Sequence, residues 1–206
     1  MQQRIIIIAG PTGSGKSALA IDVAQEFSGV IINADSMQVY RHLNVISARP
    51  PASDLKQAPH RLYGFMAADD PCSVGRWLAM AVDEIRTVWA DGKVPIVVGG
   101  TGLYLKVLME GLAPIPDVKP FFRKRATELH KQLGPEAFHY ELAELDPEAA
   151  ARISAGDTQR LIRGYEVALA TGKPLSEWQK DHPIQTPLDA AFAVVTLTPE
   201  RQIPVS

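Results

Sequence analysis

Short, continuous apolar runs and longer stretches with helical periodicity alternate along most of the chain. The expected strands cover residues 5–9, 30–32, 94–98 and 191–198. Runs that are apolar throughout, rather than at every second position, are typical of strands buried on both faces of a sheet. The expected helices cover residues 17–27, 74–89 and 102–109. This alternation predicts an α/β fold, in which helices cover both faces of a parallel sheet.

The pattern changes after residue 114, where a segment rich in proline, APIPDVKP, leads into helical periodicity without a buried strand pattern. The expected helices in this part cover residues 121–133, 135–145 and 158–170. Pro135 fits the first turn of a helix, and Gly172 fits the stop after one. We therefore predict a core at residues 1–114, a helical insertion at 115–187, and a return to the core at 188–206.

Composition and charge exclude several classes of protein. With 46% hydrophobic and 21% charged residues, the chain has the composition of an ordinary globular domain. The net charge of −2 excludes a basic surface over the whole chain, but not a local basic patch. No apolar run reaches the roughly 18 residues of a membrane span. Because the single cysteine, Cys72, excludes an internal disulfide, we expect a cytoplasmic protein without a membrane segment.

The sequence GPTGSGKS at residues 10–17 matches the phosphate-binding loop pattern G-x-x-x-x-G-K-[ST], between an expected strand and an expected helix. Glycines allow the backbone to curl around phosphate oxygens, and the N–H groups at the start of a helix attract anions. Lys16 adds a mobile cation, and the Ser17 hydroxyl is a ligand for Mg²⁺. We predict a three-layer fold like that of P-loop NTPases, with phosphate bound by Gly10, Pro11, Thr12, Gly13, Ser14, Gly15, Lys16 and Ser17.

Two polar residues follow the ends of expected strands. Asp35 comes after the strand at 30–32, and Thr101 after the strand at 94–98. Because the carboxyl ends of parallel strands line the ligand crevice, we expect both residues beside the phosphate loop. The strand at 94–98 leads into Gly-Gly-Thr, without the Mg²⁺-binding aspartate usual in NTPases. The alternatives are structural: a turn or helix cap for Asp35, and a helix cap for Thr101.

Five segments together resemble the tRNA dimethylallyltransferase family. They are GPTGSGKS, NADSMQVY, APHRLYG, VPIVVGGTGLYLKVLMEGL and GDTQRLIRGYEVALATGKPLSEW, and they follow one another in that family's order. The resemblance extends from residue 5 to about residue 201. Members of the family transfer a prenyl group to N6 of an adenosine beside the anticodon. The resemblance implies a cytoplasmic monomer that binds tRNA through the anticodon stem-loop, dimethylallyl diphosphate and Mg²⁺.

The resemblance also assigns roles to individual residues. Asp35 would accept a proton from the adenine amine, and Thr101 would hydrogen-bond near the bridging oxygen of the diphosphate. Contact with tRNA is implied for Asp35, Ser36, Met37, Gln38, Thr101, Arg123, Gln159, Arg160, Leu161, Ile162 and Arg163. Family members continue well beyond the segment TPER at residues 198–201, so we expect this chain to lack the C-terminal third and to leave apolar surface uncovered.

Basic residues gather in the helical insertion. Lys119, Arg123, Lys124, Arg125 and Lys131 lie close together in the sequence, with Glu128 as the acid among them. A solvated helix face is the simplest interpretation of such a charge run. The resemblance instead favours a patch that binds RNA phosphates.

Two other functions stay open on the sequence. A small-molecule or nucleotide kinase shares the phosphate loop and a helical insertion. The absence of an aspartate at the end of the strand at 94–98, and of an arginine-rich lid, counts against a kinase. The second alternative is a non-catalytic piece that binds phosphate or tRNA.

Overall fold

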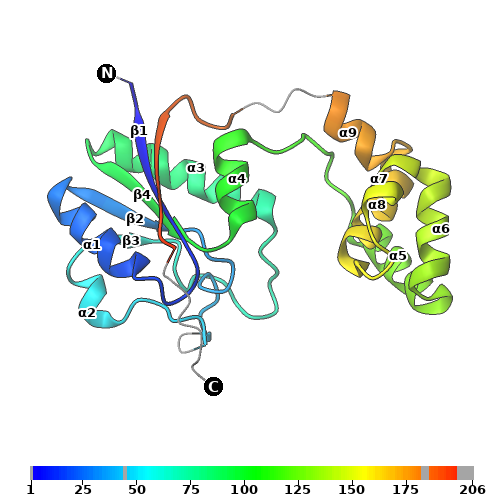
Figure 1. The fold of residues 1–206 in the computed structure, drawn as a ribbon, viewed down its shortest axis with the longest axis horizontal. Coiled ribbons are helices and arrows are strands. Elements are labelled where there is room, and N and C mark those ends of the chain that lie inside the picture. The colour runs from blue at the N-terminus through cyan, green and yellow to red at the C-terminus, as the bar shows by residue number, and fades with distance from the viewer. Residues whose placement is uncertain (1, 44–45, 182–185, 199–206) are drawn as a thin grey trace. The chain divides into compact units, whose positions relative to one another are not determined.

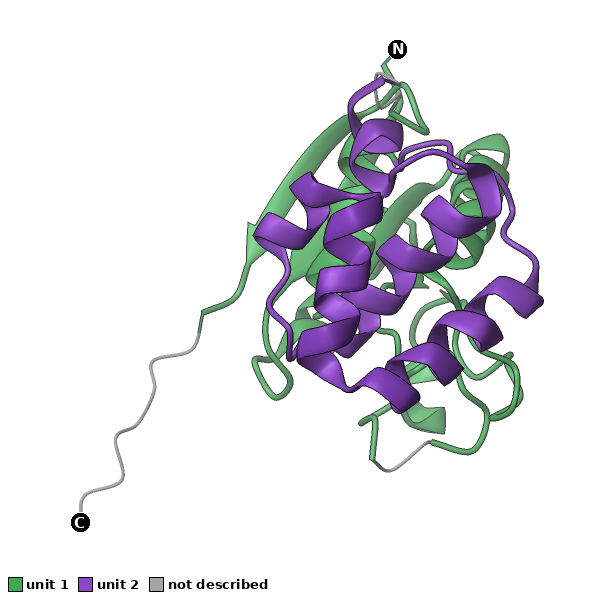
Figure 2. Cartoon of the chain, turned by 90° about the vertical axis from the view of Figure 1, so that its right-hand side faces the viewer, with its two compact units in different colours: residues 1–111, 185–206 green, residues 112–184 purple. Residues whose placement is uncertain are grey.

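The computed structural model describes residues 2–43, 46–181 and 186–198, and the chain divides into two compact units (Figure 2). Unit 1 consists of Met1–Gly111 and Gln185–Ser206, and unit 2 consists of Leu112–Ile184. Both bounds of unit 2 lie three residues before those expected from the sequence, and the proline-rich segment that precedes its first helix belongs to this unit.

Unit 1 is built on a five-stranded parallel sheet with the strand order β3-β2-β4-β1-β5 (Figure 1). The strands are β1 (Arg4–Ala9), β2 (Gly29–Asn33), β3 (His60–Arg61), β4 (Val94–Gly99) and β5 (Ala191–Thr196). The predicted parallel sheet is confirmed. Strand β3 was not predicted, because two residues are too few to show a hydrophobic pattern.

Helices cover both faces of this sheet. They are α1 (Lys16–Glu26), the short α2 (Ala52–Leu55), α3 (Val74–Ala90) and α4 (Gly102–Glu110). Successive side chains of β1 point to opposite faces: Ile5 and Ile7 pack with α3 and α4, whereas Ile8 packs with α1. The predicted three-layer α/β architecture is therefore confirmed, with a separate apolar core on each side of the sheet.

The described part of unit 2 is helical. Its helices are α5 (Pro120–Leu133), α6 (Pro135–Leu145), α7 (Pro147–Arg152), α8 (Thr158–Thr171) and α9 (Leu175–Asp181). The predictions for α5, α6 and α8 are confirmed to within a residue or two, whereas α7 and α9, with 6 and 7 residues, are too short to show helical periodicity. Phe138, Leu142 and Leu161 are fully buried at the centre of this unit. Among the described helices of either unit, none is long and apolar enough to cross a membrane.

A buried carboxylate fixes the two short helices of unit 2. Asp146 caps α7 by accepting a hydrogen bond of 2.9 Å from the N–H of Ala149. It also accepts hydrogen bonds from the N–H and hydroxyl of Ser176 in α9, at 2.9 and 2.6 Å. Burial opposes ionisation of Asp146, but these hydrogen bonds outweigh it and hold the pKa of the carboxyl below its ordinary value.

Strand β5 forms one edge of the sheet, and part of its apolar surface is open to solvent. The exposed fractions of Val194 and Val195 are 51% and 42%. Side chains of parallel strands are normally covered on both faces. These two side chains are therefore only partly covered.

Candidate active site

A cavity of about 210 Å³ lies in unit 1, beside the loop that joins β1 to α1 and the carboxyl ends of β2 and β4. It is lined by Thr12, Gly13, Gly15, Lys16, Ser17, Ala18, Asp35, Gln38, Ala48, Tyr63, Val98 and Gly99. The cavity thus brings together the loop at residues 10–17 and Asp35, which are far apart in the sequence. Strand β4 lies between β1 and β2 in the sheet, so the loop and Asp35 flank the end of β4.

The glycines of the loop have backbone conformations that other residues rarely adopt. Gly13 and Gly15 have φ values of 79° and 84°, and Gly15 is the N-cap of α1. At Gly10, a Cβ atom would lie 2.6 Å from the carbonyl oxygen of Leu197, which follows β5. The loop therefore depends on glycine both for its left-handed turns and for the close approach of a distant segment.

Two side chains of this loop, Lys16 and Ser14, have polar groups that a bound anion would contact. The Lys16 ammonium donates a 2.5 Å hydrogen bond to the carbonyl oxygen of Pro11 in the same loop. Partial burial lowers the pKa of Lys16, while the negative charge of Asp35 acts in the opposite direction. The Ser14 hydroxyl is buried and has no hydrogen-bond partner within the described residues. Leaving such a group unpaired costs about 1–3 kcal/mol, which an anion in the loop would recover.

Asp35 is held in a tight turn by Asn33, a fully buried residue at the end of β2. The Asn33 amide donates to the carbonyl oxygens of Asp35 and Leu62 at 3.0 Å, and accepts from the Asp35 N–H at 2.9 Å. Oδ1 of Asp35 accepts a 2.9 Å hydrogen bond from the N–H of Met37. The turn proposed as an alternative role is therefore present, and the same residue also lines the cavity. Asn33 was not among the residues predicted for the site. Its position, as a polar residue at the end of an apolar run, was the feature of the sequence that pointed to it.

Thr101 does not cap α4 with its side chain. Its hydroxyl accepts a 3.0 Å hydrogen bond from the N–H of Ser36 and donates a longer one, of 3.4 Å, to the Ser36 hydroxyl. The helix-cap alternative is therefore wrong for this side chain. The 3.0 Å hydrogen bond links the segment that follows β2 to the segment that follows β4. The backbones also approach closely nearby: a Cβ atom on Gly99 would lie 2.1 Å from the carbonyl oxygen of Ala34.

Tyr63 was not selected from the sequence, although it lies within the quoted segment APHRLYG. It lines the cavity, and its ring forms a T-shaped contact with the His60 ring, with the two ring centroids 5.5 Å apart. Burial raises the pKa of the Tyr63 hydroxyl, and the negative charge of Asp35 adds to this effect. The cavity therefore has an aromatic wall whose hydroxyl stays protonated at neutral pH.

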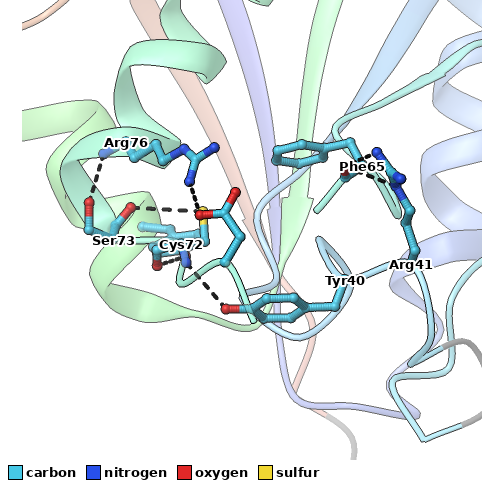
Figure 3. A network of polar contacts seen from close by, with 8 residues as sticks. Tyr40, Arg41, Phe65, Cys72, Ser73 and Arg76 are labelled. Carbon is cyan, nitrogen blue, oxygen red and sulfur yellow. Dashed lines mark hydrogen bonds and ion pairs between the residues drawn. The ribbon is translucent and has the colours of Figure 1, made fainter. Parts of the chain in front are cut away.

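Polar contacts anchor the segment that follows Asp35 to a second loop (Figure 3). The Tyr40 hydroxyl accepts a 3.2 Å hydrogen bond from the N–H of Cys72, and Arg41 donates to the carbonyl oxygen of Phe65 at 3.2 and 3.0 Å. Gln38 donates a 2.8 Å hydrogen bond to the carbonyl oxygen of Ser47. Hydrogen bonds within the chain therefore fix the segment that contributes Gln38 to the cavity.

The residues of unit 2 that the resemblance assigns to RNA differ in exposure. Gln159 is exposed, and Arg160, whose side chain is 73% exposed, pairs with Asp157 at 3.4 Å. Leu161 and Ile162 are 0% and 6% exposed and belong to the apolar core of the unit. Both side chains pack inward, so a contact of these two residues with RNA would have to use their backbone atoms.

Arg123 of α5 and Arg163 of α8 share a buried partner. Their Nη1 atoms lie 3.5 and 2.7 Å from Oε1 of Glu166. Glu128, the acid among the basic residues of α5, pairs with Lys124 at 3.9 Å. Glu166 could not be predicted as the partner of Arg123, because the two helices meet only in the folded chain.

Comparisons with known proteins place these features in a family. The family model described as IPP transferase matches residues 38–204, and the model described as isopentenyl transferase matches residues 3–67. The chain is 54% identical over 183 residues to the tRNA dimethylallyltransferase of Rhodospirillum rubrum, a match that covers 89% of this chain and 56% of that protein. It is 48% identical over 196 residues to the tRNA dimethylallyltransferase of Paramagnetospirillum magneticum, with 95% and 62% covered.

Two solved structures are also similar. A eukaryotic dimethylallyltransferase acting on tRNA superposes with a TM-score of 0.77 at 31% identity, over 94% of this chain and 48% of that chain. The tRNA isopentenylpyrophosphate transferase of Staphylococcus epidermidis gives a TM-score of 0.54 at 32% identity, over 94% and 62%. The chain thus spans less than two thirds of the length of these relatives. Since the first family model covers most of the sequence, the chain belongs to the IPP transferase family, the family that the resemblance predicted.

Proposed function

We propose that this chain carries the diphosphate site of a tRNA prenyl transfer reaction. In this reaction a dimethylallyl group moves from dimethylallyl diphosphate to N6 of an adenosine next to the anticodon. The observation that carries the proposal is the cavity that combines a phosphate-binding loop with the carboxylate of Asp35. The names of the two curated relatives, both tRNA dimethylallyltransferases, support this choice of reaction.

The loop at residues 10–17 would hold the diphosphate. Its unpartnered Ser14 hydroxyl would gain an acceptor, and Lys16 would exchange the Pro11 carbonyl for a phosphate oxygen. The Ser17 hydroxyl, which also lines the cavity, would hold Mg²⁺ together with phosphate oxygens. When bound, this ion supplies positive charge that stabilises the departing diphosphate.

In the transfer step, the adenine N6 atom attacks the allylic carbon and forms the new C–N bond. The C–O bond to the diphosphate breaks, and the diphosphate leaves with the bonding electrons. Asp35 would take the proton that N6 loses, because its carboxylate lines the cavity beside the loop. Thr101 would donate near the bridging oxygen, since its 3.4 Å hydrogen bond to Ser36 is long and easily exchanged.

Contact with tRNA would come from local surfaces, because the chain as a whole has a net charge of −2. In unit 1, Ser36, Met37 and Gln38 follow Asp35, so they would lie next to an adenosine lifted out of its stack. In unit 2, the exposed guanidinium of Arg160 and those of Arg123 and Arg163 would bind phosphates. A tRNA substrate and a single cysteine favour the cytoplasm.

Thermal unfolding in the presence of ligands tests the site. With Mg²⁺ present, dimethylallyl diphosphate should raise the unfolding temperature more than ATP at the same concentration, because binding to the folded state stabilises it. Stronger protection by ATP would support a kinase. Labelled dimethylallyl diphosphate and tRNA then test transfer directly, and binding without transfer would identify a non-catalytic diphosphate-binding chain.

A further inference from the structure

Glu166 occupies an unusual position in unit 2. It lies within α8, where its side chain is 2% exposed and its neighbours Tyr165 and Val167 are buried. Removing a carboxylate from water costs several kcal/mol unless partners compensate for it. An apolar residue would fill a core position of this kind more simply, so the charge calls for an explanation.

The partners of Glu166 come from two different helices. Arg123 reaches it from α5, and Arg163 reaches it from the preceding turn of α8. Both Nη1 atoms approach the same oxygen, Oε1, at 3.5 and 2.7 Å, so the two nitrogens lie no farther apart than the sum of these distances. The second oxygen, Oε2, is buried and has no hydrogen-bond partner in the described parts of the chain. The carboxylate is therefore one shared anchor for two guanidinium groups.

Each guanidinium keeps an open side. The side chains of Arg123 and Arg163 are 55% and 42% exposed, although the carboxylate between them is buried. An arginine has five N–H donors, and Nη1 supplies the contact to Glu166 in both cases. Within the described residues, neither guanidinium has a second ion-pair partner. Donors of both groups therefore remain available to a ligand in solvent.

The charges of this cluster sum to one positive charge. Two guanidinium groups held close together repel each other, and the carboxylate offsets that repulsion. One phosphodiester carries one negative charge and accepts hydrogen bonds from a guanidinium fork. The cluster therefore matches one backbone phosphate of a nucleic acid in charge and in donor chemistry.

We propose that Glu166 is a positioning residue that holds Arg123 and Arg163 together as a binding site for one RNA phosphate. This inference rests on the proposed function, since it takes tRNA as the ligand. Preorganised donors lose less conformational entropy on binding, so removing the anchor should weaken binding. A carboxylate that merely neutralised the arginines would have the opposite effect, because its removal would strengthen binding.

The test is the affinity of the full 206-residue chain for an anticodon stem-loop RNA, measured by fluorescence anisotropy at several salt concentrations. Glu166→Gln keeps the shape of the side chain and makes the chain more positive. We expect its affinity to fall about tenfold, and the slope of log K against log[salt] to become shallower by about one unit. Glu128→Gln makes the same charge change at an exposed site on α5 and should leave the affinity unchanged or slightly higher. Equal or tighter binding by Glu166→Gln overturns the proposal.

Glu166→Asp provides a second variant, with the net charge of the unaltered chain. Its carboxylate is one methylene shorter, so it cannot keep both contacts, and a loss of RNA affinity must then come from geometry. If Glu166→Gln fails to fold, Glu166→Asp decides, and wild-type affinity in that variant overturns the proposal. A lower unfolding temperature with wild-type RNA affinity would indicate a purely structural role and would also overturn it. If the unaltered chain does not bind the RNA, both the proposed function and this inference fail.

Discussion

The two units place their charged groups in different ways. In unit 1, the polar groups of the cavity sit on loops at strand ends. Near and distant parts of the chain both fix them: Asn33 holds Asp35 two positions away, and it also bonds Leu62, 29 positions away. In unit 2, charged side chains project from helices, and one of their ion pairs joins remote residues: Arg123 and Glu166 are separated by 43 positions. The phosphate-binding loop can be recognised from a local sequence motif, whereas the pair of Arg123 and Glu166 exists only once two helices have packed.

The largest expected effect is on the rate of prenyl transfer, when the carboxylate of Asp35 is removed. Asp35→Asn should leave diphosphate affinity nearly unchanged and slow prenyl transfer by about 10²–10⁴-fold, the usual cost of losing a general base. Single-turnover transfer to tRNA measures this effect. Asp22→Asn, which makes the same charge change on the exposed side of α1, is the control. A near-normal rate for Asp35→Asn would mean that the proton leaves by another route.

The next largest effect is on diphosphate affinity, when the Lys16 ammonium is removed from the same site. Lys16→Ala should weaken binding of pyrophosphate or dimethylallyl diphosphate by about 10- to 100-fold, from the ~1.5–3 kcal/mol of a hydrogen bond to a charged group. The fold should persist, because Lys16 is the first residue of α1 and its side chain makes one hydrogen bond, to Pro11. Calorimetric titration measures the affinity, with Lys93→Ala at an exposed position as the control. Unchanged affinity would show that Lys16 does not take part in phosphate binding.

A smaller effect on stability tests whether unit 2 depends on remote polar contacts. Asp146→Asn should lower the free energy of unfolding of this unit by about 1–3 kcal/mol, because its buried partners lose an ionised acceptor. The folded pKa of Asp146 lies below its ordinary value, so its stabilising contribution is present above about pH 5 and is lost as the pH falls through the folded pKa.

Denaturant unfolding between pH 3 and 7, followed by circular dichroism, measures this dependence. The acid-side loss of stability should be smaller in Asp146→Asn than in the unaltered chain. Asp117→Asn, at an exposed position of the same unit, should keep the normal profile. Identical profiles for all three proteins would show that Asp146 contributes little to stability.

The smallest expected effect is on the salt dependence of tRNA binding, and it compares an exposed basic residue of unit 2 with one of unit 1. Arg123→Gln should make the slope of log K against log[salt] for tRNA shallower by about one unit, if this guanidinium neutralises one phosphate. Lys106→Gln, on the exposed surface of α4 in unit 1, is the matched loss of a basic residue. A slope unchanged from wild type would assign Arg123 to a solvated helix face.

The sequence was most informative where structure depends on near neighbours. The strands, the long helices and the glycine-rich loop follow from hydrophobic periodicity and from backbone conformations that favour glycine. Short elements such as α7 and β3 have too few residues for any periodicity. Asn33, Tyr63 and Glu166 were missed because their roles depend on hydrogen bonds, burial or ion pairs formed across the fold, which a linear pattern does not contain.

The position of β1 within the sheet has a consequence for synthesis of the chain. β1 pairs with β4 on one side and with β5 on the other, and the whole of unit 2 is encoded between those two strands. At roughly 5–20 residues per second, a ribosome needs on the order of ten seconds to add the residues between Gly99 and Ala191. During that interval one edge of β1 has no partner strand, and Leu197, whose carbonyl approaches Gly10, does not yet exist. The phosphate-binding loop therefore acquires this neighbour only after the whole of unit 2 has been synthesised.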